Sequence, residues 1–282
     1  MVFQKIKTLK ASLYQTDLIG KNTELKNNDS NKMTGNAVKL HTIREGNSPA
    51  VFVINGFLSG KGNDVSDWLE VVDELYPLNK VIHVQWRAGN ISDLVFDEGL
   101  IKAAPSINNQ NSMLKKLGAV SLVAANKVSG HWRKAFTETA IVGTELAAML
   151  DVEKGYDGCI LMGHSLGARI IHHTLDKLPA NKVSQCYLLA GAVSSGSKLW
   201  NTIFELHPHT QFINCMSKTD SVLKYAYKVG TLLRETPIGL HPLGHKSHPL
   251  IINQDVTEVA QKHTKFKHKA LGLLLQNIVR AK

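Results

Sequence analysis

The sequence is short of cysteine, of acidic residues and of long apolar runs. Three cysteines among 282 residues are too few, and too odd in number, for a disulfide framework, so we interpret them as buried free thiols in a reducing compartment. No stretch approaches the roughly 18 to 20 apolar residues that cross a bilayer, and the N-terminus lacks the apolar core of a signal peptide. We therefore expect a cytoplasmic protein without a signal peptide or transmembrane helix.

Basic residues outnumber acidic ones. Lys and Arg number 33 against 23 Asp and Glu, which gives a formal charge of +10. This excess favours an anionic partner, and peripheral contact with an anionic membrane is compatible with it. Nucleic acid is not expected as a partner, because the basic segment at residues 262–269 holds a single aromatic residue, Phe266, and no recognised motif.

Hydrophobic patterning divides the chain near residue 48. Residues 1–48 are polar and rich in Lys and Asn, which predicts a flexible arm that ends in edge strands around residues 37–43. From residue 49 to 282, short apolar runs alternate with helix-period segments, which predicts an α/β domain with a mostly parallel central sheet flanked by helices. The expected strands are 50–55, 81–85, 159–162, 186–190, 211–216 and 250–253, and the expected helices are 67–75, 137–150, 166–178 and 271–279.

The motif that carries chemistry is Gly163-His164-Ser165-Leu166-Gly167, between a predicted strand and a predicted helix. This G-x-S-x-G pattern is typical of a nucleophile elbow, in which a serine lies on a sharp strand-to-helix turn. Gly163 and Gly167 are needed because the turn leaves no room for side chains two residues to either side. Ser165, the expected nucleophile, then stands at a helix N-terminus, whose N–H groups stabilise developing negative charge.

A serine hydroxyl needs a base, and the base needs an orienting acid. In this fold the acid and then the histidine follow the serine along the chain. Asp220 is the preferred acid because it lies on the loop after a strand, at the sheet edge where catalytic groups collect; Asp255 is the alternative. For the base we favour His263, on the loop after the last strand, over His245 and His248, which lie before that strand.

The oxyanion hole is expected to use two backbone amides. In this fold one belongs to the residue after the nucleophile and the other to the loop after the first core strand. These positions are Leu166 and Phe57. Gly56, just before Phe57, allows the backbone to approach the substrate closely.

A zinc site is a competing interpretation of the histidine-rich segment. His241, His245 and His248 have spacings of four and three residues, which zinc ligands can have. No cysteine lies near them, and histidines beside prolines are common on protein surfaces. We therefore expect no metal, and acyl transfer by a serine requires no organic cofactor.

The segment at residues 87–136 is too long for a simple crossover. One interpretation is a lid, an amphipathic helix that covers the active site and contacts an anionic bilayer. The other is a surface helix packed on the sheet, which the pattern alone favours because the apolar face is weak. The apolar residues at helical spacing are Met113, Leu117, Val120, Ala124 and Val128.

Several segments together resemble a family of α/β-hydrolases that includes the transmembrane and coiled-coil domain proteins of animals and a membrane-interacting lipase of fungi. The segments, which span about residues 50–280 in the right order, are VFVINGFLSG, Asp67-Trp68, GHSLGARII, LLAGAV, SKTDSVL and INQDVTEVAQKHTKF. The resemblance implies an α/β-hydrolase fold with a triad of Ser165, Asp220 and His263. Unlike the family's membrane-embedded members, this sequence has no transmembrane segment.

The predicted activity is hydrolysis of carboxylic esters, lipid esters in particular, through an acyl-enzyme on Ser165. The position of the expected lid, the charge of +10 and the resemblance favour a lipid substrate. One alternative is a thioesterase or acyltransferase with the same triad. Another is a binding protein on a catalytically silent hydrolase fold.

Overall fold

The computed structural model describes residues 37–56, 65–86, 122–227, 235–244 and 248–280. Each of the six predicted strands is present, and the expected edge strand near residue 40 is also formed. The elements, in chain order, are β1 (Val38–Arg44), β2 (Asn47–Ile54), α2 (Ser66–Leu75), β3 (Asn79–Trp86), α5 (Leu122–Val152), η2 (Lys154–Tyr156), β4 (Cys159–His164), α6 (Leu166–Lys177), β5 (Val183–Leu189), α7 (Leu199–Leu206), β6 (Gln211–Met216), η3 (Leu223–Tyr227), β7 (Ile251–Asp255), η4 (His263–Lys265) and α9 (Lys269–Arg280).

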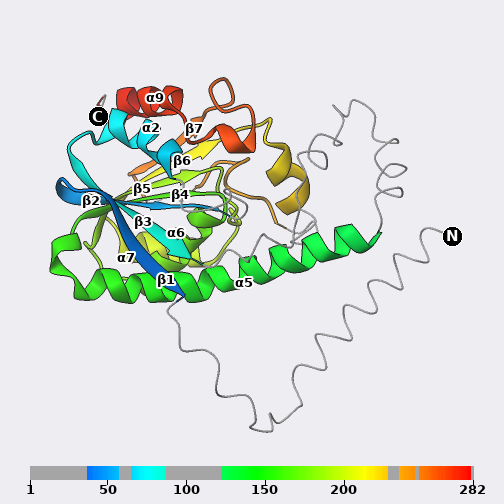
Figure 1. Ribbon diagram of the computed structural model, residues 1–282, viewed down its shortest axis with the longest axis horizontal. Helices are drawn as coiled ribbons and strands as arrows, with labels where there is room; N and C mark the ends of the chain where they lie inside the picture. Colours follow the sequence, from blue (N-terminus) through cyan, green and yellow to red (C-terminus); the bar gives the residue numbers. More distant parts are fainter. Residues whose placement is uncertain (1–36, 57–64, 87–121, 228–234, 245–247, 281–282) are drawn as a thin grey trace, which may run out of the picture. The chain divides into compact units, whose positions relative to one another are not determined.

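A seven-stranded sheet forms the centre, with strand order β1-β3-β2-β4-β5-β6-β7 (Figure 1). β1 is antiparallel to β3 at one edge, and all other neighbours are parallel. Every residue of β4, at the middle of the sheet, is buried, as expected for a strand covered on both faces. The prediction of a mostly parallel α/β-hydrolase fold is therefore confirmed.

Helices cover both faces of the sheet. α2 and α9 pack together over one face, and α5, α6 and α7 lie on the other (Figure 1). The inner side of α6 carries Ala168, Ile171 and Leu175, which are all fully buried. Burying a side chain the size of Ile171 or Leu175 stabilises the fold by roughly 1.5–3 kcal/mol, so these residues anchor α6, and with it the preceding turn, to the sheet.

α5 is longer than the sequence predicts. The expected helix at residues 137–150 extends back to Leu122, so α5 has 31 residues and includes the end of the 87–136 insertion. The rest of that insertion, residues 87–121, falls outside the described residues, and the lid stays a prediction. Across the ranges that the structure describes, no helix combines the length and the apolar character of a membrane span.

Candidate active site

Ser165 lies on a strained turn between β4 and α6. Its backbone has φ 57° and ψ −115°, a conformation that non-glycine residues rarely adopt. A Cβ atom on Gly163 would come within 2.6 Å of the amide nitrogen of Ala168, and one on Gly167 would overlap the carbonyl oxygen of Ile54. These contacts explain why the residues two positions before and after the serine are glycines.

The oxyanion side of the site lies where β2 ends. A Cβ atom on Gly56 would be 2.7 Å from Ser165 Cβ and 3.3 Å from the Leu166 nitrogen, so the backbone just after β2 passes directly over the turn. The Leu166 amide donates to no acceptor among the described residues. It is therefore available to a substrate oxygen. Phe57, the other expected donor, lies outside the described residues.

Asp220 and His263 are joined by a hydrogen bond. The Nδ1–H of His263 donates to Asp220 Oδ2 at 2.6 Å, and the amide of Leu223 donates to Asp220 Oδ1 at 3.0 Å. Asp220 is fully buried, and the His263 side chain is 10% exposed. Because Nδ1 carries the donated proton, Nε2 is the nitrogen that can accept another. This pair can therefore orient an imidazole to act as a base.

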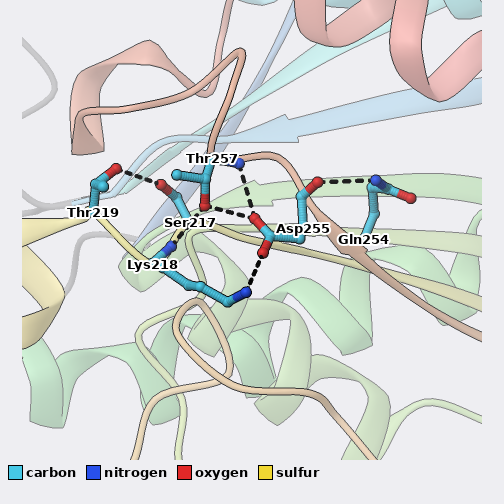
Figure 2. Close-up of polar contacts among 6 residues, drawn as sticks. All are labelled: Ser217, Lys218, Thr219, Gln254, Asp255 and Thr257. Carbon is cyan, nitrogen blue, oxygen red and sulfur yellow. Dashed lines mark hydrogen bonds and ion pairs between the residues drawn. The ribbon is translucent and has the colours of Figure 1, made fainter.

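Contacts between two loops hold this pair in place. The loop after β6 carries Asp220, and the loop after β7 leads to His263. The hydroxyl of Thr219 donates to the carbonyl of Gln261 at 2.8 Å. The amide of Lys218 donates to the hydroxyl of Thr257 at 2.9 Å, as Figure 2 shows.

Asp255, the alternative acid, has other partners. Its Oδ1 accepts hydrogen bonds from the hydroxyl and the amide of Thr257, and its Oδ2 pairs with Lys218 Nζ at 2.9 Å (Figure 2). The hydrogen bond from the Thr257 hydroxyl, and to a smaller extent the contact with Lys218, lower the pKa of Asp255 to about 2. The Asp255 side chain is 40% exposed. Asp255 therefore braces the loop after β6, while Asp220 is the carboxylate bonded to His263.

His164, the residue before the serine, connects the turn to the base. Its Nε2–H donates to the carbonyl of His263 at 2.8 Å, and the two ring centroids are 4.7 Å apart. Burial, then the charges of His263 and Lys267, hold the pKa of His164 well below its usual value, so the ring is neutral. Sequence reasoning missed this contact because the G-x-S-x-G pattern assigns no role to the residue before the serine.

Ser165, Asp220 and His263 lie at one edge of the sheet. They follow the carboxyl ends of β4, β6 and β7, where parallel sheets collect functional groups. Ser165 is 7% exposed. Within the described part of the chain, no hydrogen bond joins Ser165 to His263, and in enzymes without substrate such bonds are often long.

The other candidate histidines lie elsewhere. His248 precedes β7 and so lies at the amino ends of the parallel strands. Its ring contacts Phe204 and Phe212, and its Nε2 is 3.2 Å from the carbonyl oxygen of His207. It is therefore placed away from Ser165. His245 falls outside the described residues. Among the residues that are described, no cluster of His, Cys, Asp or Glu could hold a metal ion.

The sheet order and the strained serine turn together define a protein with the α/β-hydrolase fold. The family model described as "protein of unknown function (DUF726)" matches residues 40–280, and the chain belongs to this family. The part of the resemblance that concerns the fold is thus confirmed. The family description assigns no activity, so hydrolysis by a serine belongs to the proposal below.

Three other proteins are similar to this chain. An uncharacterized membrane protein of Caenorhabditis elegans is 25% identical over an alignment of 259 residues, and the match covers 83% of this chain and 41% of that protein, so the chain spans about two fifths of this relative. An α/β hydrolase enzyme from a lagoon-sediment metagenome superposes with a TM-score of 0.43 at 15% identity, covering 92% of this chain and 99% of the other. A CIB-like hydrolase from Thermoplasma acidophilum has a TM-score of 0.44 at 11% identity, with coverages of 87% and 93%.

Proposed function

We propose that this protein is a serine hydrolase that cleaves carboxylic esters through an acyl-enzyme on Ser165. The observation that carries the proposal is the 2.6 Å hydrogen bond between His263 and the fully buried Asp220, at the sheet edge that also holds the strained serine turn. An exposed or unpaired aspartate could not fix an imidazole in this way. A turn serine and an oriented imidazole are the two groups that acyl transfer requires.

The proposed reaction has two steps. His263 Nε2 takes the proton of Ser165 Oγ as the oxygen attacks the ester carbonyl, and Asp220 stabilises the imidazolium that forms. The amides of Leu166 and Phe57 donate to the tetrahedral oxyanion, and its collapse expels the alcohol, which takes the proton from His263. Water, deprotonated by the same nitrogen, then attacks the acyl-enzyme; collapse of this second tetrahedral intermediate releases the carboxylic acid, and His263 returns the proton to Ser165 Oγ.

Lipid esters are the substrate class we propose, with peripheral contact with an anionic membrane. The formal charge of +10 supports attraction to such a surface. The Caenorhabditis elegans relative, described as a membrane protein, is consistent with work at a membrane. Hydrolysis of phospholipid or acylglycerol in vesicles should rise when anionic lipid replaces neutral lipid and should fall with added salt. Equal rates on both kinds of vesicle would count against membrane contact.

A fluorophosphonate probe tests the nucleophile directly. The probe should label the wild type and Ser194→Ala but not Ser165→Ala. Ser194 is a matched control because it is a partly exposed serine on the loop after β5. A folded wild type that takes up no label, or a Ser165→Ala variant that labels fully, would refute the proposal.

A further inference from the structure

A buried lysine lies between the loop of the base and the end of β2. Lys267 follows His263 by four residues, and its side chain is only 6% exposed. Its Nζ donates to Asn55 Oδ1 at 3.0 Å and forms an ion pair with Asp67. Burying an ammonium group is costly unless it is paired and hydrogen-bonded. The position of this side chain is therefore set by Asn55 and Asp67.

Asn55 is held by more than the lysine. Its Oδ1 also accepts from Trp68 Nε1 at 2.7 Å, and its carbonyl accepts from Trp86 Nε1 at 2.9 Å. Lys267 Nζ lies 5.4 Å from the centre of the Trp68 ring, within cation–π range. These contacts restrain both the side chain and the backbone of Asn55. They therefore fix the direction in which the chain leaves β2.

That direction matters because the next residue touches the nucleophile turn. Gly56 packs against Ser165 Cβ and the Leu166 nitrogen, with no space for a side chain between them. A shift of Asn55 would carry Gly56 with it and change the gap above the serine. A misplacement of about 1 Å at a reacting centre can lower a rate roughly 100-fold.

We propose that Lys267 is a positioning residue for ester hydrolysis, an inference that rests on the function proposed above. It holds the Asn55–Gly56 end of β2 in place over Ser165 and joins that strand end to the loop that carries His263. One side chain thereby fixes the oxyanion side and the base side of the site relative to each other. Asp67 neutralises the lysine's charge, which gives a role to the Asp67-Trp68 segment that the catalytic mechanism leaves unused.

Kinetics on a water-soluble p-nitrophenyl ester test the role in catalysis. Lys267→Met keeps the apolar stem and removes the three N–H donors, so kcat should fall about 10- to 100-fold while KM changes less than about threefold. Lys267→Arg keeps the charge and should recover part of the loss. The matched control is Lys182→Met. Lys182 lies just before β5, at the amino ends of the parallel strands and so away from the site, and it pairs with Asp157. Its replacement should leave kcat within about twofold of the wild-type value.

Amide hydrogen exchange on the full chain gives a second readout that does not depend on activity. Exchange at residues 53–56 should rise in Lys267→Met and stay at the wild-type level in Lys182→Met. Wild-type exchange there, or an unchanged kcat in Lys267→Met, would overturn the inference. If Lys267→Met does not fold, Lys267→Gln decides, because it removes the charge that pairs with Asp67 and shortens the side chain, and a kcat equal to that of the wild type in this variant would overturn the inference.

The two proposals fail in different ways. A wild type that neither labels at Ser165 nor hydrolyses the ester refutes the hydrolase, and with it the role of Lys267 in catalysis. The exchange measurement would still show whether Lys267 fixes the end of β2. An active wild type with an insensitive Lys267→Met refutes only the positioning role.

Discussion

Replacing Asp220 by asparagine tests the acid–base pair with little change in shape. The Oδ1 of the new side chain can still accept from the amide of Leu223, which donates at 3.0 Å in the wild type. The NH2 group then faces His263 Nδ1, where the wild type has a carboxylate oxygen at 2.6 Å. A donor at that position favours the imidazole with its proton on Nε2. The histidine of Asp220→Asn therefore cannot accept the proton of Ser165.

The loss should be large because Asp220 is fully buried and water cannot replace its carboxylate. Asp→Asn changes in Ser-His-Asp sites lower kcat by about 10⁴. At about 1.36 kcal/mol for each factor of ten, this is a loss of about 5 kcal/mol in transition-state stabilisation. The free energy of unfolding should fall by only about 1–2 kcal/mol, since one buried hydrogen bond is altered and the volume is kept.

The assay is kcat and KM on a p-nitrophenyl ester, together with urea unfolding of each variant. Asp255→Asn is the matched control, because Asp255 is the last residue of β7, at the same carboxyl ends of the strands, but pairs with Lys218 at the surface. It should lose less than about tenfold in kcat, as surface ion pairs contribute little. A kcat of Asp220→Asn within tenfold of the wild type, or an equal loss in Asp255→Asn, would refute the assignment.

Other variants test the turn and the buried histidines. His164→Phe keeps the ring volume but loses the bond to the His263 carbonyl, so kcat should fall about tenfold with little change in KM; an unchanged kcat would contradict this role. Gly167→Ala places a Cβ atom on the Ile54 carbonyl and should lower the free energy of unfolding in urea by about 3 kcal/mol or more. Burial, then the charges of His173 and Arg169, lower the pKa of His172 to about 3. The unfolded chain, with an ordinary histidine pKa of about 6.5, therefore takes up a proton at a higher pH than the folded protein does. The contribution of the neutral ring to the free energy of unfolding is complete above about pH 6.5 and is lost as the pH falls toward 3. Between pH 7 and pH 5 the wild type should lose about 2 kcal/mol more than His172→Phe, and parallel unfolding curves would show that His172 does not titrate in this way.

The central strands of the sheet could be predicted because they are buried on both faces. β4 is buried throughout, so it appears in the sequence as a continuous apolar run, unlike the helices around it. α7 was not predicted. Its buried residues, Trp200, Ile203 and Phe204, follow helical spacing, but a helix of eight residues is too short for the period to stand out from a loop.

The site was predictable only where chain order carries information. The serine motif is local, and Asp220 was proposed because it lies on a loop after a strand, where the carboxyl ends of a parallel sheet collect ligands and catalytic groups. His164 and Lys267 were missed because their contacts join residues 99 and 212 positions apart. No local pattern encodes such a contact. It exists only once β2 and the loops after the last strands have been brought together by the fold.

The strain at Ser165 explains why so many backbone contacts surround it. A non-glycine residue in such a conformation costs on the order of 1–3 kcal/mol and persists only where the surroundings enforce it. Here the Ser165 amide donates to the carbonyl of Leu189 at 2.9 Å, and its carbonyl accepts from the amide of Ala192 at 3.0 Å, while Gly56 packs against its Cβ. Both bonds hold the serine to the segment that leaves β5, so the hydroxyl is placed by the sheet itself. His263 is tied to the same turn through the ring of His164, so the strained turn and the Asp220–His263 pair are held together by the fold itself.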